Sequence, residues 1–147
     1  VMQVRDLMNP SVVSIEPGSS CALAARLISR HNVGALPVCA SDGRLRGMVT
    51  DRDIVTRCLA AGRSASSTPV RDVMTAKVIT ARPDMEVALA AGLMGREQIR
   101  RLPVMENGRL CGMVSLGDLA MQDETSIDAG DALTEISNNL SSRDGRL

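Results

Sequence analysis

The spacing of apolar residues predicts the same short series of elements twice along the chain. Each series opens with a β-branched run, at Val12–Ile15 and at Val78–Thr80, which stops shortly before a proline and is typical of a short strand. An amphipathic helix follows in each copy, because apolar residues recur there at the spacing of one helix face. The residues predicted to face the core are Leu23, Ala24, Leu27 and Ile28 in the first helix and Leu89, Ala90, Leu93 and Met94 in the second.

Two more strands and a second helix complete each series. A hairpin is predicted at Asp42-Gly43 and again at Asn107-Gly108, because both dipeptides favour tight turns between strands. The last strand of each series runs directly into a helix that begins at about Asp51 or Leu116. The predicted order is therefore β-α-β-β-α in both copies, with the segment Val4–Met8 leading into the first.

Comparison of the two halves shows that the chain is an internal repeat. Val4–Met8 returns as Val70–Met74, an offset of 70 − 4 = 66 positions. After the hairpin the offset falls to 118 − 53 = 65, because Asp53 returns as Asp118. The lost position lies in the hairpin loop, where deletions are tolerated. We therefore predict repeats at residues 1–61 and 70–123, joined by a Gly/Ser/Pro-rich linker at 62–69.

The tail, residues 124–147, departs from the repeat. A short amphipathic helix is predicted from Asp128 to Leu140, and the residues from Ser141 onward are expected to be frayed. The side chains predicted on its apolar side are Ala132, Leu133, Ile136 and Leu140.

Neither copy is expected to be stable alone, because about 60 residues without aromatic side chains bury little apolar surface. Packing the two copies sheet to sheet solves this problem. The predicted fold class is α/β (α+β), with two β-α-β-β-α repeats related by a pseudo-twofold axis and two equivalent clefts around it.

The composition of the chain excludes several classes of function. The 17 basic and 17 acidic residues cancel, which argues against a nucleic-acid binder that relies on a phosphate-neutralising face. No apolar run approaches the ~20 residues of a membrane span, and the first residues lack the apolar region of a signal peptide. We therefore expect a cytoplasmic protein that binds neither nucleic acid nor membrane. Without Phe, Trp or Tyr, a bound base has to lie between aliphatic side chains.

The candidate chemistry lies where the third strand of each copy meets its helix. Gly-Met-Val is followed there by Thr50 and Asp53 in the first copy and by Ser115 and Asp118 in the second. One interpretation is a capping box, in which the hydroxyl caps the helix and the acid reaches back. The other is a nucleotide site, in which the hydroxyl and the carboxylate hold phosphate and ribose. The pattern alone leaves both open.

Three repeated motifs together resemble a tandem pair of CBS domains, the Bateman module. They are the lead-ins, Leu-Pro-Val on the second strand and Gly-Met-Val-Thr/Ser-x-x-Asp at the end of the third. The resemblance runs from Val4 to about Met121 and is strongest to small stand-alone bacterial two-CBS proteins, including the hypoxic-response type. It implies a non-catalytic regulatory module that binds AMP, ADP, ATP or a related adenosyl ligand. It also implies a homodimer. Because the sequence shows no effector domain, we expect the output to be delivered to an effector protein in trans or to be absent. The alternative is a structural or interaction protein whose clefts bind no ligand.

The resemblance assigns a role to each candidate residue. Asp53 and Asp118 would hold the ribose hydroxyls, and Thr50 and Ser115 would contact phosphate or the neighbouring sugar. The adenine would lie on the first two strands of each repeat, at Ser14, Ala35, Leu36 and Pro37 in one cleft and at Thr80, Arg101, Leu102 and Pro103 in the other.

The two clefts are not chemically equal. Arg101 stands where members of the family often place a phosphate-binding base, and the first repeat has Ala35 there instead. Arg52 supplies a positive charge within the first motif, where the second has Gly117. We expect both clefts to bind, with unequal affinity.

The cysteines and the single histidine point to structural roles. The four cysteines include no Cys-x-x-Cys pair, so no metal site is predicted, and no structural disulfide is predicted because we expect a cytosolic chain. By comparison with the other repeat, Cys21 and Cys39 are expected in the core, whereas Cys58 and Cys111 are expected to be more exposed. His31 is expected to end a helix. No hydroxyl nucleophile has an evident base, and we predict no enzyme activity.

Overall fold

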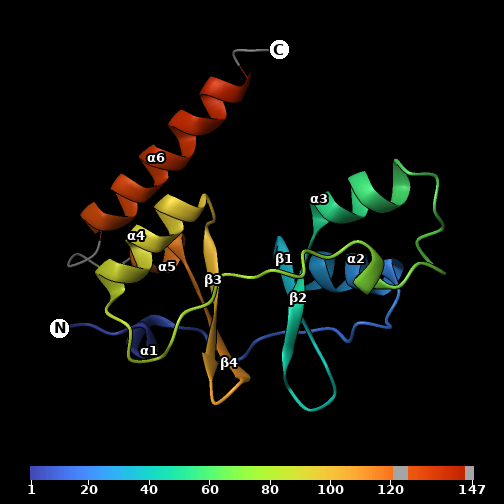
Figure 1. The fold of residues 1–147 in the computed structure, drawn as a ribbon, viewed down its shortest axis with the longest axis horizontal. Helices are drawn as coiled ribbons and strands as arrows, with labels where there is room; N and C mark the ends of the chain where they lie inside the picture. The colour runs from blue at the N-terminus through green and yellow to red at the C-terminus, as the bar shows by residue number, and fades with distance from the viewer. Residues whose placement is uncertain (121–125, 145–147) are drawn as a thin grey trace. The chain divides into compact units, whose positions relative to one another are not determined.

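The computed structural model describes residues 1–120 and 126–144, and Figure 1 shows how its elements follow one another. Helix, hairpin and helix occur in the same order in both repeats, as predicted. The elements up to the linker are α1 (Val4–Leu7), α2 (Cys21–His31), β1 (Ala35–Cys39), β2 (Leu45–Thr50), α3 (Asp51–Asp53) and the π-helix η1 (Ile54–Leu59). They are followed by the 3-10 helix η2 (Val70–Asp72), α4 (Val87–Glu97), β3 (Arg101–Glu106), β4 (Arg109–Ser115), α5 (Leu116–Ala120) and α6 (Ser126–Asp144).

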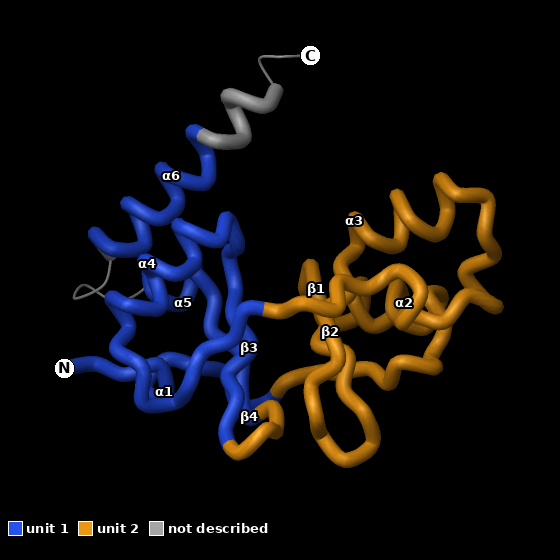
Figure 2. The backbone as a smooth tube through the Cα atoms, in the orientation of Figure 1, with its two compact units in different colours: residues 1–11, 79–106, 111–147 blue, residues 12–78, 107–110 orange. Residues whose placement is uncertain are grey.

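The chain forms two compact units, which Figure 2 distinguishes by colour. Unit 1 contains residues 1–11, 79–106 and 111–147, and unit 2 contains residues 12–78 and 107–110. Each unit has its own aliphatic core, and equivalent positions of the repeat are buried in both. These positions are Leu36, Val38 and Val49 in unit 2 and Leu102, Val104 and Val114 in unit 1.

The two lead-in segments exchange places. The Val4 and Arg5 amides donate to the carbonyls of Met85 and Pro83, at 2.8 and 2.9 Å, and this places the first lead-in on the second repeat. The second lead-in makes the equivalent bonds to the first repeat. There Val70 N–H donates to Ser19 O at 2.8 Å, and Arg71 N–H donates to Pro17 O at 3.1 Å. Each lead-in therefore belongs to the compact unit that is formed mainly by the other repeat.

The linker belongs to unit 2 and packs there against the start of α2. The amides at the start of α2 donate to it, Cys21 N–H to Thr68 O at 2.8 Å and Ala22 N–H to Ala65 O at 2.9 Å. Thr68 is only 2% exposed. The segment therefore closes over the N-terminal turn of α2.

The hairpins form as predicted. β1 pairs antiparallel with β2, with Ala35 opposite Thr50, and β3 pairs with β4. The turn glycines Gly43 and Gly108 adopt positive φ values of +86° and +77°, which a residue without a Cβ accepts at little cost.

The first predicted strand of each repeat is much shorter than expected. In the first repeat Ile15 makes a single parallel bridge, to Val38. In the second the equivalent bridge, to Val104, is made by Ala81, one residue after the predicted run. Ile15 N–H donates to Pro37 O at 3.0 Å, and Cys39 N–H donates back to Ile15 O at 2.9 Å. A proline two positions after each bridge ends the pairing, since it has no N–H to donate.

The helix that follows matches the prediction in the first repeat more fully than in the second. α2 is capped by the Ser20 hydroxyl, which accepts from Leu23 N–H at 3.1 Å, and it ends at His31, as expected. Its four predicted core residues are buried or half-buried. In α4, Leu89 was predicted to face the core but is 54% exposed. Ala90 and Met94 are buried and Leu93 is half-buried, as predicted, whereas the additional buried residue is Ala91, because α6 covers a second side of this helix.

α6 is longer than predicted. It runs from Ser126 to Asp144, so the residues expected to fray are helical as far as Asp144, and 145–147 lie outside the described residues. Ala132 and Ile136 are buried as predicted, together with Ala129, whereas Leu133 is 43% exposed. The side chain of Leu140 lies outside the described part. No helix among the described residues is both long and apolar enough to cross a membrane.

Candidate functional site

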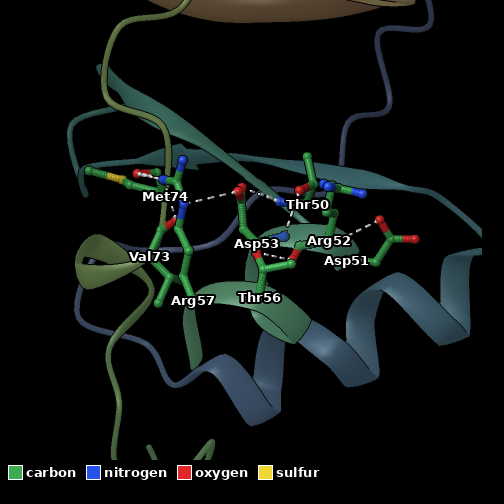
Figure 3. A network of polar contacts seen from close by, with 8 residues as sticks. All are labelled: Thr50, Asp51, Arg52, Asp53, Thr56, Arg57, Val73 and Met74. Atoms are coloured by element: carbon green, nitrogen blue, oxygen red, sulfur yellow. Dashed lines mark hydrogen bonds and ion pairs between the residues drawn. The ribbon is translucent and has the colours of Figure 1, made fainter. Parts of the chain in front are cut away.

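The candidate site in unit 2 lies at the corner where β2 becomes α3, shown in Figure 3. Asp53 N–H donates to the Thr50 hydroxyl at 3.0 Å, and Thr50 N–H donates back to Asp53 Oδ2 at 3.0 Å. Thr50 has an extended backbone and stands at the N-cap, so this is a complete capping box. Asp53 is only 9% exposed, so little of it is open to water.

The second corner repeats this geometry in unit 1, where β4 becomes α5. Asp118 N–H donates to the Ser115 hydroxyl at 3.0 Å, and Ser115 N–H donates to Asp118 Oδ2 at 2.9 Å. Asp118 is half-buried, more open than Asp53. The capping interpretation is therefore confirmed at both corners.

Capping leaves part of each carboxylate free for other bonds. An ionised carboxylate has about four lone-pair sites, and the main-chain amide takes one of them on Oδ2. The hydroxyl of Thr50 or Ser115 accepts from an amide and keeps its own proton to donate. The cap and a ligand contact are thus compatible at the same two residues.

A further charged residue, Arg57, belongs to the first corner. Arg57 Nε lies 3.8 Å from Asp53 Oδ1, one helical turn further on. Its Nη1 donates to the carbonyls of Val73 and Met74, at 3.2 and 3.4 Å, as Figure 3 shows. Sequence reasoning missed this residue. The i, i+4 spacing of an acid and an arginine was the signal that pointed to it.

The predicted adenine-contacting strands lie beside these corners. Ala35 is paired with Thr50, and the main chain is joined directly to the helix start because Asp51 N–H donates to Gly34 O at 3.2 Å. Ala35, Leu36 and Pro37 are buried, and the exposed Ser14 precedes the bridge from Ile15 to the same strand.

Unit 1 brings its own set together in the same way. Leu116 N–H donates to Arg100 O at 2.8 Å, which joins the start of α5 to the residue before β3. Leu102 and Pro103 are buried, and Arg101 and Thr80 are half-buried. Ala81, which follows Thr80, bonds to Pro103 O at 2.9 Å. Each unit therefore places its strand residues and its Ser/Thr-Asp pair in one neighbourhood.

The cations named from the sequence differ in position. Arg52 is exposed on the outer side of the first turn of α3. Arg101 is the first residue of β3 and lies partly under its neighbours. The structure gives neither guanidinium an ion pair within 4.0 Å among the described residues.

The cysteines form no metal centre in the described part of the chain. No three His, Cys, Asp or Glu side chains come together there in a way that suits a metal ion. Cys21 and Cys39 are buried as predicted, but Cys58 was expected to be more exposed and is wholly buried. It lies on the inner side of η1, in the same core cluster as Cys21. Burial, together with the neighbouring Cys58 thiol, raises the pKa of Cys21 to about 11.

Comparison with known proteins gives one consistent family. The model of the CBS domain matches residues 4–60 and 70–123. The chain is 44% identical over 134 residues to the CBS domain-containing protein YhcV of Bacillus subtilis, covering 91% of this chain and 94% of that protein. It is 34% identical over 116 residues to hypoxic response protein 1 of Mycobacterium tuberculosis, covering 79% and 81% of the two chains.

Solved structures agree. Hypoxic response protein I, crystallised with two coordinated zinc ions, superimposes with a TM-score of 0.77 at 33% identity, covering 82% of this chain and 98% of that one. The CBS domain pair of protein MJ0100, in complex with 5'-methylthioadenosine and S-adenosyl-L-methionine, gives a TM-score of 0.74 at 28% identity, covering 82% and 94%. The resemblance inferred from the repeated motifs is thereby confirmed: the chain belongs to the CBS-domain family and carries two CBS domains in tandem.

Proposed function

We propose that this CBS-domain pair is a non-catalytic regulatory module that binds an adenine nucleotide or a related adenosyl ligand at its two strand-to-helix corners. The observation that carries the proposal is the duplicated corner, in which a buried or half-buried carboxylate sits beside a hydroxyl and the main chain of a paired strand. The adenosyl ligands bound by the MJ0100 pair support this ligand class.

The chemistry of the corner suits a ribose. Two adjacent ribose hydroxyls are donors, and the open lone pairs of Asp53 or Asp118 are acceptors with no competing proton. A buried charged acceptor discriminates strongly against a ligand that lacks one hydroxyl, because the acceptor would then lose its water without replacement. We therefore expect ribonucleotides to bind more tightly than 2'-deoxyribonucleotides.

The neighbouring strands suit an adenine. Leu36 and Leu102 are fully buried, and the prolines that follow them are buried as well. These leucine side chains are closed to a ligand, so the strands offer a base their main-chain N–H and C=O groups. With no aromatic ring in the chain, any stacking area has to come from aliphatic side chains that are partly exposed.

A structural role is the second candidate, and one observation favours it. Asp53 and Asp118 each already accept a main-chain hydrogen bond, so both motifs have a purpose without a ligand. In that case the protein would act through its surface alone.

Calorimetric titration with AMP, ADP, ATP, 5'-methylthioadenosine and S-adenosyl-L-methionine separates the two functions. Binding of at least one of them, with a matching rise in the melting temperature by circular dichroism, supports the sensor. Absence of heat and of any thermal shift with all five supports the structural role. Absorbance near 260 nm adds a direct check, because a chain without aromatic residues gives almost none of its own.

The proposal extends to assembly. A homodimer that passes the bound state to an effector protein in trans would complete the regulatory function. Sedimentation equilibrium of the purified chain, with and without AMP, tests the dimer, and a mass that stays at one chain of 15.6 kDa contradicts it.

A further inference from the structure

Arg57 touches two parts of unit 2 at once. On one side its Nε faces Asp53 Oδ1 at 3.8 Å. On the other its Nη1 donates to Val73 O and Met74 O. The arginine side chain is about half exposed, whereas the aspartate side chain is only 12% exposed. One guanidinium therefore connects the candidate ribose acceptor to a segment about twenty residues further along the chain.

Neither side of this arrangement is fully bonded. A separation of 3.8 Å is too long for a hydrogen bond, so Arg57 and Asp53 attract each other only through their charges. The two carbonyl contacts, at 3.2 and 3.4 Å, are at the long end for N–H···O bonds and share one nitrogen. The guanidinium thus lies between the charged Asp53 carboxylate and the carbonyl dipoles of Val73 and Met74. If its attraction to the carboxylate weakens, its attraction to the carbonyls gains in relative strength.

The segment that Arg57 holds is the edge partner of β2. Met48 N–H donates to Thr75 O at 2.9 Å, and Thr75 N–H donates to Met48 O at 2.8 Å. β2 ends at Thr50, in the same corner that contains Asp53. A few residues beyond Thr75, after Val78, the chain leaves unit 2.

We propose that Arg57 is a positioning residue that transmits the state of Asp53 to the segment Val73–Met74. This inference rests on the proposed nucleotide function. When ribose hydroxyls donate to Asp53, the carboxylate's charge is shared with them and its pull on Arg57 weakens. Arg57 then bonds more firmly to the two carbonyls and holds Val73–Thr75 more tightly against β2.

The sequence places this device in one repeat only. At the offset that relates Asp53 to Asp118, the position equivalent to Arg57 is Gln122, which has no charge and lies outside the described residues. We therefore expect the two candidate sites to differ in the structural change that follows binding.

Arg63 provides a matched control. Its Nη2 pairs with Asp72 Oδ2 at 2.8 Å, so it also ties the end of the η1 region to the start of the same segment. It makes no contact with Asp53 among the interactions of the described residues. Arg63→Gln therefore loosens the segment without breaking the link to the candidate site.

Hydrogen exchange of the peptide that contains Thr75 tests the proposal in the full chain. In the wild type and in Arg63→Gln, saturating AMP is expected to slow exchange about fivefold or more, the lower end of typical coupling between sites. In Arg57→Gln, AMP still binds but this slowing is lost. Arg57→Lys, which keeps the charge but not the planar fork, restores part of it. Equal slowing in Arg57→Gln and the wild type would overturn the proposal.

A second set of exchange measurements, made without any ligand, tests the Arg57 link independently of the proposed function. Asp53→Asn removes the charge but keeps an acceptor for Thr50 N–H, and so imitates the ligand's effect on Arg57. It should slow exchange at Thr75 in the wild-type background and leave it unchanged in Arg57→Gln, the signature of a coupled pair. If wild type binds none of the adenosyl ligands yet this cycle shows coupling, the nucleotide function fails and the Arg57 link stands. If Asp53→Asn acts equally in both backgrounds, the link itself is wrong.

Discussion

Gly47 lies directly against the main chain of Thr75: a Cβ added to Gly47 would stand 2.5 Å from the Thr75 carbonyl oxygen. The equivalent glycine of the second repeat, Gly112, lies against the other lead-in, where a Cβ would meet Asn9 O at 3.2 Å and Met8 Sδ at 2.7 Å. Each glycine therefore makes room for the lead-in that comes from the other repeat. The Gly-Met-Val motif is explained by this packing as well as by the corner that follows it.

We expect Gly47→Ala to destabilise the protein by about 1–3 kcal/mol, the usual cost of overpacking a closely fitted site. The carbonyl oxygen belongs to the backbone and cannot move aside without breaking the Met48–Thr75 bonds. Urea unfolding followed by circular dichroism at 222 nm measures the effect, since the chain has no tryptophan to report it. Gly130→Ala is the control, because nothing lies within 4 Å of its added Cβ and the helix should gain up to ~1 kcal/mol. Unchanged stability in Gly47→Ala would contradict the fit.

Two glycines of α4 test how α6 is held. A Cβ on Gly95 would lie 3.3 Å from Ala132 Cα, whereas a Cβ on Gly92 would meet only the end of Arg96 at 3.5 Å. Gly95→Leu should therefore push α6 off α4 and expose Ala129 and Ile136 to water. Limited proteolysis is expected to cut α6 in Gly95→Leu and to spare it in Gly92→Leu. Equal protection of α6 in both variants would show that this helix is held elsewhere.

The sequence predicted the repeat and the corners because both depend on local pattern. Thr50 and Asp53 form their capping box within four residues, and the Asn107-Gly108 turn needs only its own backbone preferences. Such features depend mainly on residues close together in the sequence, so they can be predicted without knowledge of the tertiary contacts.

What the sequence did not predict depends on contacts between distant segments. Leu89 was assigned to the core by helical periodicity, but α6 covers a neighbouring face and leaves Leu89 exposed. Cys58 was judged by its counterpart Asp123, yet η1 turns Cys58 into the core beside Cys21. The sequence also did not predict that the lead-ins exchange places. A repeat pattern shows which segments are equivalent, but it does not show which repeat each lead-in packs against.

The buried Cys21 thiol gives a pH dependence with a definite sign. Burial first, then the adjacent Cys58, raises its pKa from 9.0 to about 11 in the folded protein. Between these values the unfolded chain loses the proton while the folded chain keeps it, so stability should fall as pH rises from 9 to 11. Urea midpoints across this range should fall less steeply in Cys21→Ala. The chain has no tyrosine and only one lysine, Lys77, but burial also raises the pKa of Cys39 and of Cys111, so only the difference in slope between the two proteins belongs to Cys21. Parallel slopes in both proteins would argue against a buried thiol.

Asp53 has two roles to separate, and two substitutions do so. Asp53→Ala removes the capping acceptor and should cost about 1 kcal/mol of stability, whereas Asp53→Asn keeps an acceptor for Thr50 N–H and should cost less. Both lose the charge that would accept from ribose, so each should weaken AMP binding by about 1.5–3 kcal/mol at that site. Calorimetry and urea unfolding on the same samples give both numbers. If Asp53→Asn binds AMP like the wild type, the acid acts as a cap alone.

Arg101 should distinguish the two sites by the charge of the ligand. It is half-buried at the start of β3, where repeat 1 has the buried Ala35. A guanidinium that contacts phosphate contributes about 1.5–3 kcal/mol, so Arg101→Ala should weaken AMP at one of two sites by tenfold or more and leave adenosine nearly unchanged. Arg100→Ala is the matched control: this neighbouring arginine is exposed, and only its main-chain carbonyl joins the corner, by accepting from Leu116 N–H. Two-site calorimetric titrations with adenosine and AMP measure the difference. Equal losses for both ligands would mean that Arg101 supports the fold of β3 and not the phosphate. Equal losses in Arg100→Ala would mean that the effect comes from general charge, which 150 mM salt screens beyond about 8 Å.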